Sequence, residues 1–324
     1  MDIRRIIIDV DVGTDDFLAL IYLIHADNKN KVKIEGIICS HGNTELENVV
    51  VNVVRLLELL RRTDIPVYRG AKSQLLSIKV ELHKYHGEDG FADLKHEQVP
   101  DITIVGDKLG IIALHDTVSL FPNKISLICL GPLTTLALSL KLFDDLASKL
   151  KDVWIMGGNF TASLLGVGNW TCSAEFNFYT DPEAAHIVLE SLKCPIFILP
   201  WETCLIPKIP LDWRFTTLGT STPELKLLAK AEQIIYSMHD SEEWVPCDTF
   251  LVFCYMNPEK HINKFSSHYA SVELHGTLTR GQVVLDHMKK FKPNVTIIED
   301  IDAELFKQEM LELRGGDDNG NDDI

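Results

Sequence analysis

Four carboxylates fall within eight consecutive residues, DVDVGTDD, which follow an apolar run and precede the apolar stretch FLALIYLI. They are Asp9, Asp11, Asp15 and Asp16. Like charges this close together repel each other, and a hard divalent cation relieves the repulsion because it prefers several oxygen ligands. Helix capping is the alternative, with Thr14 as the N-cap and the last two carboxylates in the first turn. Capping leaves Asp9 and Asp11 unexplained, so the pattern favours a metal site.

Two other motifs also combine closely spaced carboxylates with a metal. An EF-hand loop that began at Asp9 would need a glutamate where the chain has Leu20, which excludes that motif. A phosphatase of the haloacid dehalogenase type also carries an Asp-x-Asp pair after its first strand. Gly13, where that motif has Thr or Val, and the second carboxylate pair disfavour it. It stays as an alternative that would use magnesium and form a phospho-aspartate at Asp9.

The composition is that of a globular enzyme. The chain has 324 residues, of which 46% are hydrophobic and 24% charged. The formal net charge of -16 argues against a nucleic acid partner, because neutralising phosphates requires clustered Lys and Arg. We expect one domain over residues 1–314, since no linker or internal repeat marks a boundary, and an acidic disordered tail, GGDDNGNDDI, over 315–324.

The number of cysteines and the length of the apolar runs indicate where in the cell the protein resides. An odd number of cysteines, seven, is scattered through apolar segments, which is not the pattern of a disulfide framework. The first apolar run is too short for the core of a signal peptide, and no run approaches the ~20 residues of a membrane span. We therefore expect a cytoplasmic enzyme with no membrane partner.

Short β-branched runs alternate with helical patterns along most of the chain. The expected strands are 4–10, 32–40, 65–70, 125–131, 152–158 and 195–201, and the expected helices begin near Asp15 or span 46–62, 108–121, 133–143 and 182–192. A helical region should follow from Pro210 to Ser241, then a helix from about Cys247 and an antiparallel hairpin over 270–287. This order predicts a doubly wound, mostly parallel α/β sheet with helices on both faces and a C-terminal helical and antiparallel part.

Polar residues follow most of the expected strands. His41 and Asn43 come after the second strand, Asn159 after the strand at 152–158, and Glu175 and Asn177 lie farther on in AEFNFYTDPEAA. Ligands of open parallel sheets bind at the carboxyl ends of the strands, so these side chains should gather around one site.

The pattern Asp-x-Asp-x-Gly-x-Asp-Asp resembles the N-terminal signature of the inosine-uridine preferring nucleoside hydrolases. SHGN, YHGEDG, LGPLTTLAL, WIMGGN, AEFNFYTDPEAAHIV and PCDTFLVF resemble further blocks of that family and occur in its order, from Asp9 to about Pro258. The resemblance implies hydrolysis of the N-glycosidic bond of ribonucleosides to free base and ribose, with a tightly bound calcium ion. It implies purine or broad base preference and a homodimer or homotetramer. A non-catalytic nucleoside-binding or ribose-binding protein on the same fold is the other alternative.

The resemblance also assigns residues. Asp11 is expected to activate the water as general base and to share in coordination, while Asp16, Asp248 and the backbone carbonyl of Leu130 are expected metal ligands. The expected ribose ligands are Asp15, Asn43, Asn159, Glu175 and Asn177. For the last two, ordinary turn hydrogen bonds before the helix at Pro182 are the alternative.

The group that protonates the departing base is where this chain differs from the best-known members. Cys247 stands where they carry a histidine, taken to be the acid, or a tryptophan. A thiol is a weak hydrogen-bond donor, so we expect Cys247 to line the pocket without being the principal acid, and His86 is a candidate for that role. Trp201, Tyr236 and Trp244 either form an aromatic wall for the base or pack in the core.

Overall fold

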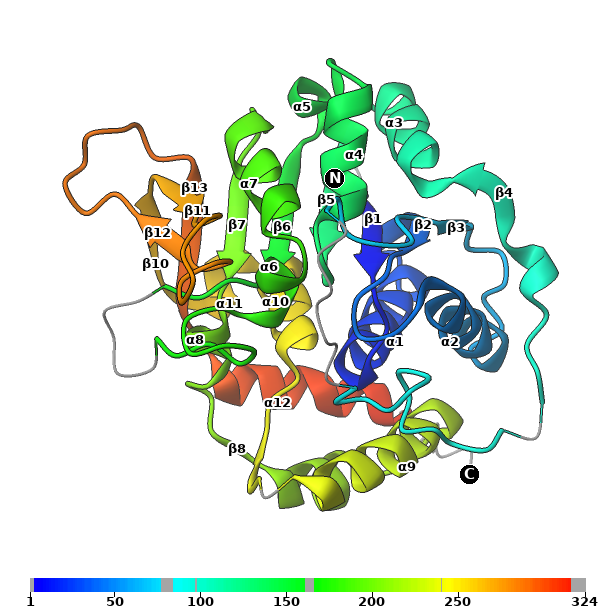
Figure 1. The fold of residues 1–324 in the computed structure, drawn as a ribbon. Helices are drawn as coiled ribbons and strands as arrows, with labels where there is room; N and C mark the ends of the chain where they lie inside the picture. The colour runs from blue at the N-terminus through cyan, green and yellow to red at the C-terminus, as the bar shows by residue number, and fades with distance from the viewer. Residues whose placement is uncertain (1–2, 77–83, 97, 161–165, 240, 316–324) are drawn as a thin grey trace, which may run out of the picture.

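A nine-stranded sheet runs through the computed structural model, which describes residues 3–76, 84–96, 98–160, 166–239 and 241–315 (Figure 1). The strand order is β10-β13-β7-β6-β5-β1-β2-β3-β4. All neighbours are parallel except β10, which pairs antiparallel with β13 at one edge. The strands are β1 (Arg4–Val10), β2 (Val32–Cys39), β3 (Val67–Arg69), β4 (Gly106–Leu109), β5 (Ile125–Cys129), β6 (Asp152–Met156), β7 (Ile196–Leu199), β10 (Ile262–His268) and β13 (Val295–Ile301).

Alternate residues of the central strands enter two different cores. In β1, Ile6, Ile8 and Val10 pack in one core, whereas Ile7 packs in the other. Side chains of successive strand residues point to opposite faces, so a strand covered on both faces reads as a continuous apolar run. This explains the uninterrupted isoleucines of the first strand.

Helices cover both faces of the sheet (Figure 1). The core that contains Ile8 is completed by α1 (Thr14–Asn28), α2 (Leu46–Leu59), α9 (Pro223–Met238), α10 (Cys247–Met256) and α12 (Ala303–Leu311). The core that contains Ile7 is completed by α3 (Gly110–Leu120), α4 (Thr134–Leu142), α5 (Leu146–Lys149) and α7 (Pro182–Ser191). The doubly wound arrangement predicted from the sequence is confirmed.

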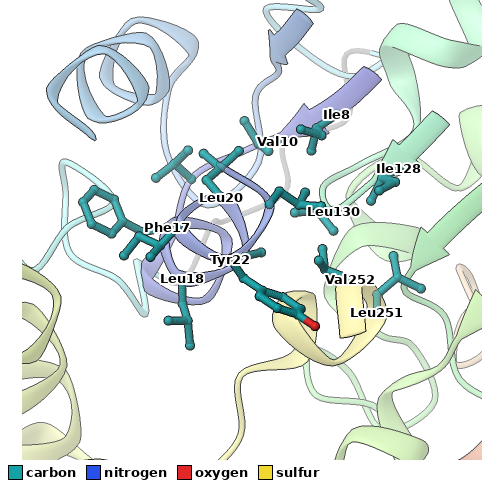
Figure 2. Close-up of a cluster of buried hydrophobic side chains, with 14 of the residues drawn as sticks. Ile8, Val10, Phe17, Leu18, Leu20, Tyr22, Ile128, Leu130, Leu251 and Val252 are labelled. Carbon is teal, nitrogen blue, oxygen red and sulfur yellow. The ribbon is translucent and has the colours of Figure 1, made fainter. Parts of the chain in front are cut away.

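Helices α1 and α10 pack in the core that contains Ile8, and each carries a predicted metal ligand in its first turn, Asp16 and Asp248. Helix α1 packs against α10, and Figure 2 shows Tyr22 of α1 next to Leu251 and Val252 of α10. This apolar contact fixes the N-terminus of α10 against the loop between β1 and α1, because buried side chains pack closely and resist displacement.

Short elements connect the main layers. They are α6 (Phe176–Thr180), α8 (Trp201–Cys204), α11 (Pro258–His261), the 3-10 helices η1 (Ile102–Ile104) and η3 (Glu312–Arg314), and a π-helix η2 (Trp213–Leu218). Two small antiparallel sheets complete the fold: β8 (Ile209–Pro210) with β9 (Glu243–Trp244), and β11 (Ala270–Val272) with β12 (Val283–Leu285). The second pair is the hairpin expected over 270–287.

The structure corrects three expectations. The segment 108–121 is not all helix, because Lys108 and Leu109 end strand β4 and the helix begins at Gly110. The region from Pro210 to Ser241 is interrupted at Gly219, whose φ of 67° lies in the left-handed region and ends the π-helix. Strands β10 and β13 were not predicted. Of the expected acidic tail, residues 316–324 lie outside the described residues.

Candidate functional site

The loop between β1 and α1 is folded by one of its own carboxylates. Asp16 Oδ2 accepts the Gly13 N–H at 2.8 Å, and Oδ1 accepts the Asp11 N–H at 3.2 Å. Asp16 thus caps α1, but the N-cap residue is Gly13 and not Thr14 as the capping alternative supposed. Capping and a ligand role are compatible here, because a carboxylate has more than one acceptor site on each oxygen.

Three carboxylates lie close enough to share one cation. Asp15, Asp16 and Asp248 each place one carboxylate oxygen within 4.8 Å of the others. Asp248 comes from the first turn of α10, and the adjacent Thr249 hydroxyl donates to the Asp15 carbonyl at 3.2 Å. Asp16 and Asp248 were predicted ligands, whereas Asp15 was predicted to bind ribose. The group of three therefore makes Asp15 a candidate ligand, as the crowding of carboxylates in the sequence suggested, although the family resemblance gave it a ribose role.

Asp11 lies beside this group and keeps one oxygen unpaired. The Asn43 N–H donates to Asp11 Oδ2 at 2.8 Å, while Asp11 Oδ1 is buried without a hydrogen-bond partner. Gly42 and Gly131 pack against this carboxyl, and a Cβ at Gly42 would lie 1.9 Å from Asp11 Oδ2. The loop thus holds the Asp11 carboxyl in one orientation with a free acceptor.

Burial and mutual repulsion both oppose the ionisation of the acidic residues in this cluster. Burial raises the pKa of Asp11, of Asp16 and of Asp248 well above the ordinary range of aspartate, and neighbouring carboxylates raise each of them further. The charges that act most on Asp11 and Asp248 belong to other aspartates. A divalent cation with oxygen ligands matches this arrangement, because it would supply the positive charge that the surrounding aspartates lack.

The expected backbone ligand at Leu130 lies at the end of β5 and is held by an amide. Asn177 Nδ2 donates to the Leu130 carbonyl at 2.7 Å and to the Met156 carbonyl at 3.2 Å. A carbonyl oxygen has two lone pairs, so the Leu130 oxygen retains one for another partner. Asn177 ties the ends of β5 and β6 together, and its ribose contact stays a prediction.

Glu175 is the N-cap of α6 and is saturated by backbone donors. Its Oε1 accepts the Asn177 N–H at 2.8 Å, and its Oε2 accepts the Gly158 N–H at 2.7 Å and the Phe178 N–H at 3.1 Å. Burial raises the pKa of Glu175 to about 7 despite these bonds. The turn hydrogen bonds that the sequence left as an alternative are therefore present, and contact with ribose stays a prediction.

Asp9 belongs to a hydroxyl network on the other face of the sheet. Ser40 Oγ donates to Asp9 Oδ1 at 2.5 Å and lies 2.6 Å from Thr135 Oγ1, which accepts the Ala71 N–H at 2.9 Å. Burial raises the pKa of Asp9 to about 7. Asp9 thus links the ends of neighbouring elements and is not one of the three clustered carboxylates.

His86 packs over the N-terminus of α1. Its Nδ1 accepts the Thr14 N–H at 3.2 Å, which places the ring proton on Nε2, 3.7 Å from Asp15 Oδ1. The ring covers Gly13, where a Cβ would lie 2.7 Å from it. Burial lowers the pKa of His86, so a neutral imidazole with an Nε2–H faces the cluster.

Cys247 is the first residue of α10 and is buried. Its thiol lies 3.7 Å from the Val245 carbonyl. The pKa of Cys247 is raised well above its ordinary value, mainly by a hydrogen bond with the Cys204 thiol and also by burial. The group next to Asp248 is therefore a protonated thiol whose hydrogen bonding is directed at the protein.

The aromatic residues divide between core and rim. Trp244 is 1% exposed and donates to Glu232 Oε1 at 2.9 Å, so it packs in the core. Trp201 and Tyr236 are partly buried against the same core. Tyr85, beside His86, stacks on His239 with ring centroids 4.4 Å apart. This stack joins the loop that carries His86 to the segment after α9.

One carboxyl at this edge of the sheet escaped the sequence prediction. Glu202, in the first turn of α8 just after β7, accepts the Phe160 N–H through Oε1 at 2.5 Å. Its other oxygen is buried without a hydrogen-bond partner. Its position was predictable, since Glu202 directly follows an expected strand, but its hydrogen bonding depends on the fold.

The chain matches the family model described as "Inosine-uridine preferring nucleoside hydrolase" over residues 6–308. The pyrimidine-specific ribonucleoside hydrolase RihA of Escherichia fergusonii is 30% identical over 317 residues, which cover 95% of this chain and 97% of that protein. The protein of the same description from Shigella flexneri serotype 5b is 31% identical over 311 residues, covering 93% and 95%.

Solved structures agree with this fold. An inosine-guanosine nucleoside hydrolase superposes with a TM-score of 0.86 at 27% identity, covering 96% of this chain and 98% of that one. A purine-preferring ribonucleoside hydrolase from Gardnerella vaginalis has the same fold, with a TM-score of 0.81 at 20% identity and the same coverage. No helix within the described ranges is long and apolar enough to cross a membrane.

Proposed function

The chain belongs to the inosine-uridine preferring nucleoside hydrolase family, and we propose that it is a calcium-dependent ribonucleoside hydrolase with purine or broad base preference. Family membership makes it an N-glycosyl hydrolase, which replaces the alternatives of a phosphatase and of a non-catalytic binding protein. The observation that carries the calcium proposal is the meeting of Asp15, Asp16 and Asp248 beside the buried Asp11.

The side chains present fit a hard divalent cation. The three clustered groups are carboxylates, the unpaired oxygens Asp11 Oδ1 and Asp15 Oδ1 are buried, and Leu130 offers a carbonyl nearby in the sheet. Oxygen-only donors of this kind suit calcium better than zinc or copper. When bound, the cation supplies positive charge to the carboxylates and lowers the pKa of water.

Asp11 is the proposed general base. Its Oδ2 is anchored by the Asn43 N–H, which leaves the buried Oδ1 to take a proton from the attacking water. The surrounding carboxylates also place negative charge where the sugar becomes positively charged in an oxocarbenium-like transition state. One group of side chains thus serves both water activation and charge stabilisation.

His86 is the proposed donor toward the departing base. The Thr14 N–H occupies Nδ1, so the remaining proton sits on Nε2 and points toward the cluster. The pKa of His86 is lowered by burial, which keeps the ring neutral near pH 7, so its Nε2–H can donate a hydrogen bond to the departing base but does not transfer a proton to it. Cys247 is proposed to line the base pocket only.

Ribose release tests the proposal. The protein is stripped of metal with a chelator and incubated with inosine, guanosine, adenosine or uridine, with and without calcium. We expect free ribose from at least one purine nucleoside with calcium, none without it, and recovery on readdition. No ribose from any nucleoside, with the protein folded and calcium present, would contradict the proposed function.

The proposed setting is cytoplasmic, and the proposed assembly is a homodimer or homotetramer. All seven cysteines are free thiols in the structure, which supports a reducing compartment. Sedimentation of the purified protein measures the assembly, and a monomer at micromolar concentration would contradict it.

A further inference from the structure

A buried ion pair joins the π-helix η2 to helix α9. Arg214 of η2 and Glu232 of α9 are both buried, and Arg214 Nε lies 2.6 Å from Glu232 Oε2. The Arg214 guanidinium also donates from Nη1 to the Gly219 carbonyl at 2.9 Å and from Nη2 to the Leu225 carbonyl at 3.5 Å. Moving two charges out of water is so costly that an apolar pair of similar volume is often at least as stable. A role in fixing geometry is therefore a better explanation of this pair than stability alone.

The second oxygen of the Glu232 carboxylate accepts a hydrogen bond from a tryptophan. The Trp244 indole N–H, which is its only side-chain donor, donates to Glu232 Oε1 at 2.9 Å. Trp244 is buried and pairs with Ile209 in the small sheet of β8 and β9. One turn farther along α9, Tyr236 hydrogen-bonds to the backbone of Val245. The Glu232 network, as we call this set, ties η2, α9 and β9 together and consists of Arg214, Glu232 and Trp244.

The Glu232 network lies at the start of the segment that carries a candidate metal ligand. Trp244 stands four residues before Asp248, and between them Pro246 is the N-cap of α10. The proline ring fixes one backbone angle of this short connection. On the other side of the ligand, the Thr249 hydroxyl donates to the Asp15 carbonyl at 3.2 Å. The chain around Asp248 is therefore held at two points, one of which is the Glu232 network.

Asp248 is the clustered carboxylate whose position depends most on packing. Asp15 and Asp16 are adjacent in the first turn of α1, whereas Asp248 comes from α10. The three groups place carboxylate oxygens within 4.8 Å of one another, which requires α10 to begin at one particular place relative to α1. Calcium takes its oxygen ligands at about 2.3–2.6 Å, so a small displacement of the start of α10 lengthens the contact with Asp248.

We propose that the Glu232 network positions Asp248 for the cation and thereby raises the affinity of the site for calcium. The inference rests on the proposed function and extends it to residues outside the carboxylate cluster. Partners that orient a metal ligand are typically worth about 10- to 100-fold in metal affinity. Because the network holds the chain before Asp248 and not the carboxylate itself, we expect an effect at the lower end, about tenfold.

Two tryptophan variants test the inference. Trp244→Phe keeps an aromatic ring but removes the indole N–H, so the Glu232 carboxylate loses that donor. Trp154→Phe is the matched control, because Trp154 is buried in the same core and donates to Asp152 Oδ1 at 3.0 Å on β6. We expect both variants to lower the Tm. Calorimetry should show calcium binding about tenfold weaker in Trp244→Phe and close to wild type in Trp154→Phe.

A change at Glu232 tests whether the residues act as one unit. Glu232→Gln keeps the shape of the side chain but removes the charge that faces Arg214. We expect it to weaken calcium binding by a similar factor, about tenfold. The double variant of Glu232→Gln with Trp244→Phe should bind calcium little more weakly than either single variant, because losses within one network do not add. Full additivity of the two losses would contradict the network.

Equal weakening of calcium binding in Trp244→Phe and Trp154→Phe, or no weakening in Trp244→Phe, would overturn the inference. Amide hydrogen exchange of the metal-free protein over residues 244–250 gives a second measurement that needs no calcium. Exchange there should be faster than in the wild type for Trp244→Phe and unchanged for Trp154→Phe. Equal exchange in the two variants would contradict the positioning role. A wild type that binds no calcium would contradict the proposed function, and the exchange rates would then decide the positioning role by themselves.

Discussion

At the β1 end of the site, Asp15, Asp16 and Asp248 lie together, and the charges that act on Asp248 belong to other aspartates. At the β6 end, by contrast, Glu175 accepts hydrogen bonds from three backbone N–H groups. Both ends bury their carboxylates. At the first end the protein leaves negative charge uncompensated, and at the second the main chain compensates it.

The difference indicates what each end can bind. Uncompensated carboxylates gain most from a cation, since burial and mutual repulsion both oppose their ionisation. A carboxylate that is saturated by N–H groups gains little from a cation. The same sheet edge thus carries a group of buried carboxylates that a cation would stabilise and, beside it, a carboxylate that the main chain already stabilises.

The largest expected effect is the loss of the base at the acidic end. Asp11→Asn removes the proton acceptor at Oδ1 while keeping the shape of the side chain. General-base assistance is worth ~100- to 10,000-fold, and we expect a loss of that order in kcat for inosine. The exposed Asp144→Asn is the matched control and should retain wild-type kcat. Unchanged turnover in Asp11→Asn would disprove the assigned role.

Thermal unfolding as a function of pH compares the two ends in one experiment. The pKa of Asp9 and that of Glu175 are raised to about 7, and the pKa of Asp16 is also raised, all by burial. A carboxyl with a raised folded-state pKa contributes stability that is complete below its unfolded pKa, near 4, and is lost as the pH rises through about 7.

We therefore expect the Tm of the metal-free protein to fall by about 5 to 10 °C between pH 5 and pH 8, taking roughly 2–4 °C for each kcal/mol. Calcium should raise the Tm at pH 8 and reduce this fall without removing it, because it compensates Asp16 and not Glu175. A Tm that rises with pH in the metal-free protein would be the opposite of this expectation.

The smallest effect is expected at Cys247. Its thiol hydrogen-bonds within the protein, to Cys204 and the Val245 carbonyl, and its pKa is raised well above the ordinary value, so it stays protonated near neutrality. Cys247→Ser and Cys247→Ala should keep kcat for inosine within about tenfold of wild type across pH 6 to 8. A loss of about a thousandfold in both, with calcium binding intact, is the scale of a general acid and would show that the thiol has that role.

The grouping of the acidic residues was easier to predict from the sequence than the surroundings of Glu175 and Glu202. Asp11, Asp16 and Asp248 stand in recognisable blocks, and the alternation of strands and helices placed them at one edge of a sheet. Glu202 was missed because its importance comes from an oxygen that the fold leaves unpaired, which no spacing reveals. Likewise, the saturation of Glu175 depends on N–H groups of Gly158 and Phe178 that only the folded chain brings together.

The same limit applies to the fold. Strand β10 was not predicted because it is an edge strand with many exposed residues, which blurs its apolar pattern, whereas β13 carries a readable strand signal in its β-branched run VTII. The break at Gly219 was missed because helical spacing continues on both sides of it. Tertiary contacts, more than the local sequence pattern, determine the secondary structure of β10 and of the segment around Gly219.

Calcium titration of the chelator-treated protein by calorimetry tests the difference between the two ends most directly. We expect one calcium ion per chain in the wild type and binding close to wild type in Glu175→Gln. In Asp248→Asn we expect binding weaker by about a hundredfold or more, on the order of the loss when one of a few carboxylate ligands is removed. No calcium binding by the wild type, or equal weakening in the two variants, would contradict it.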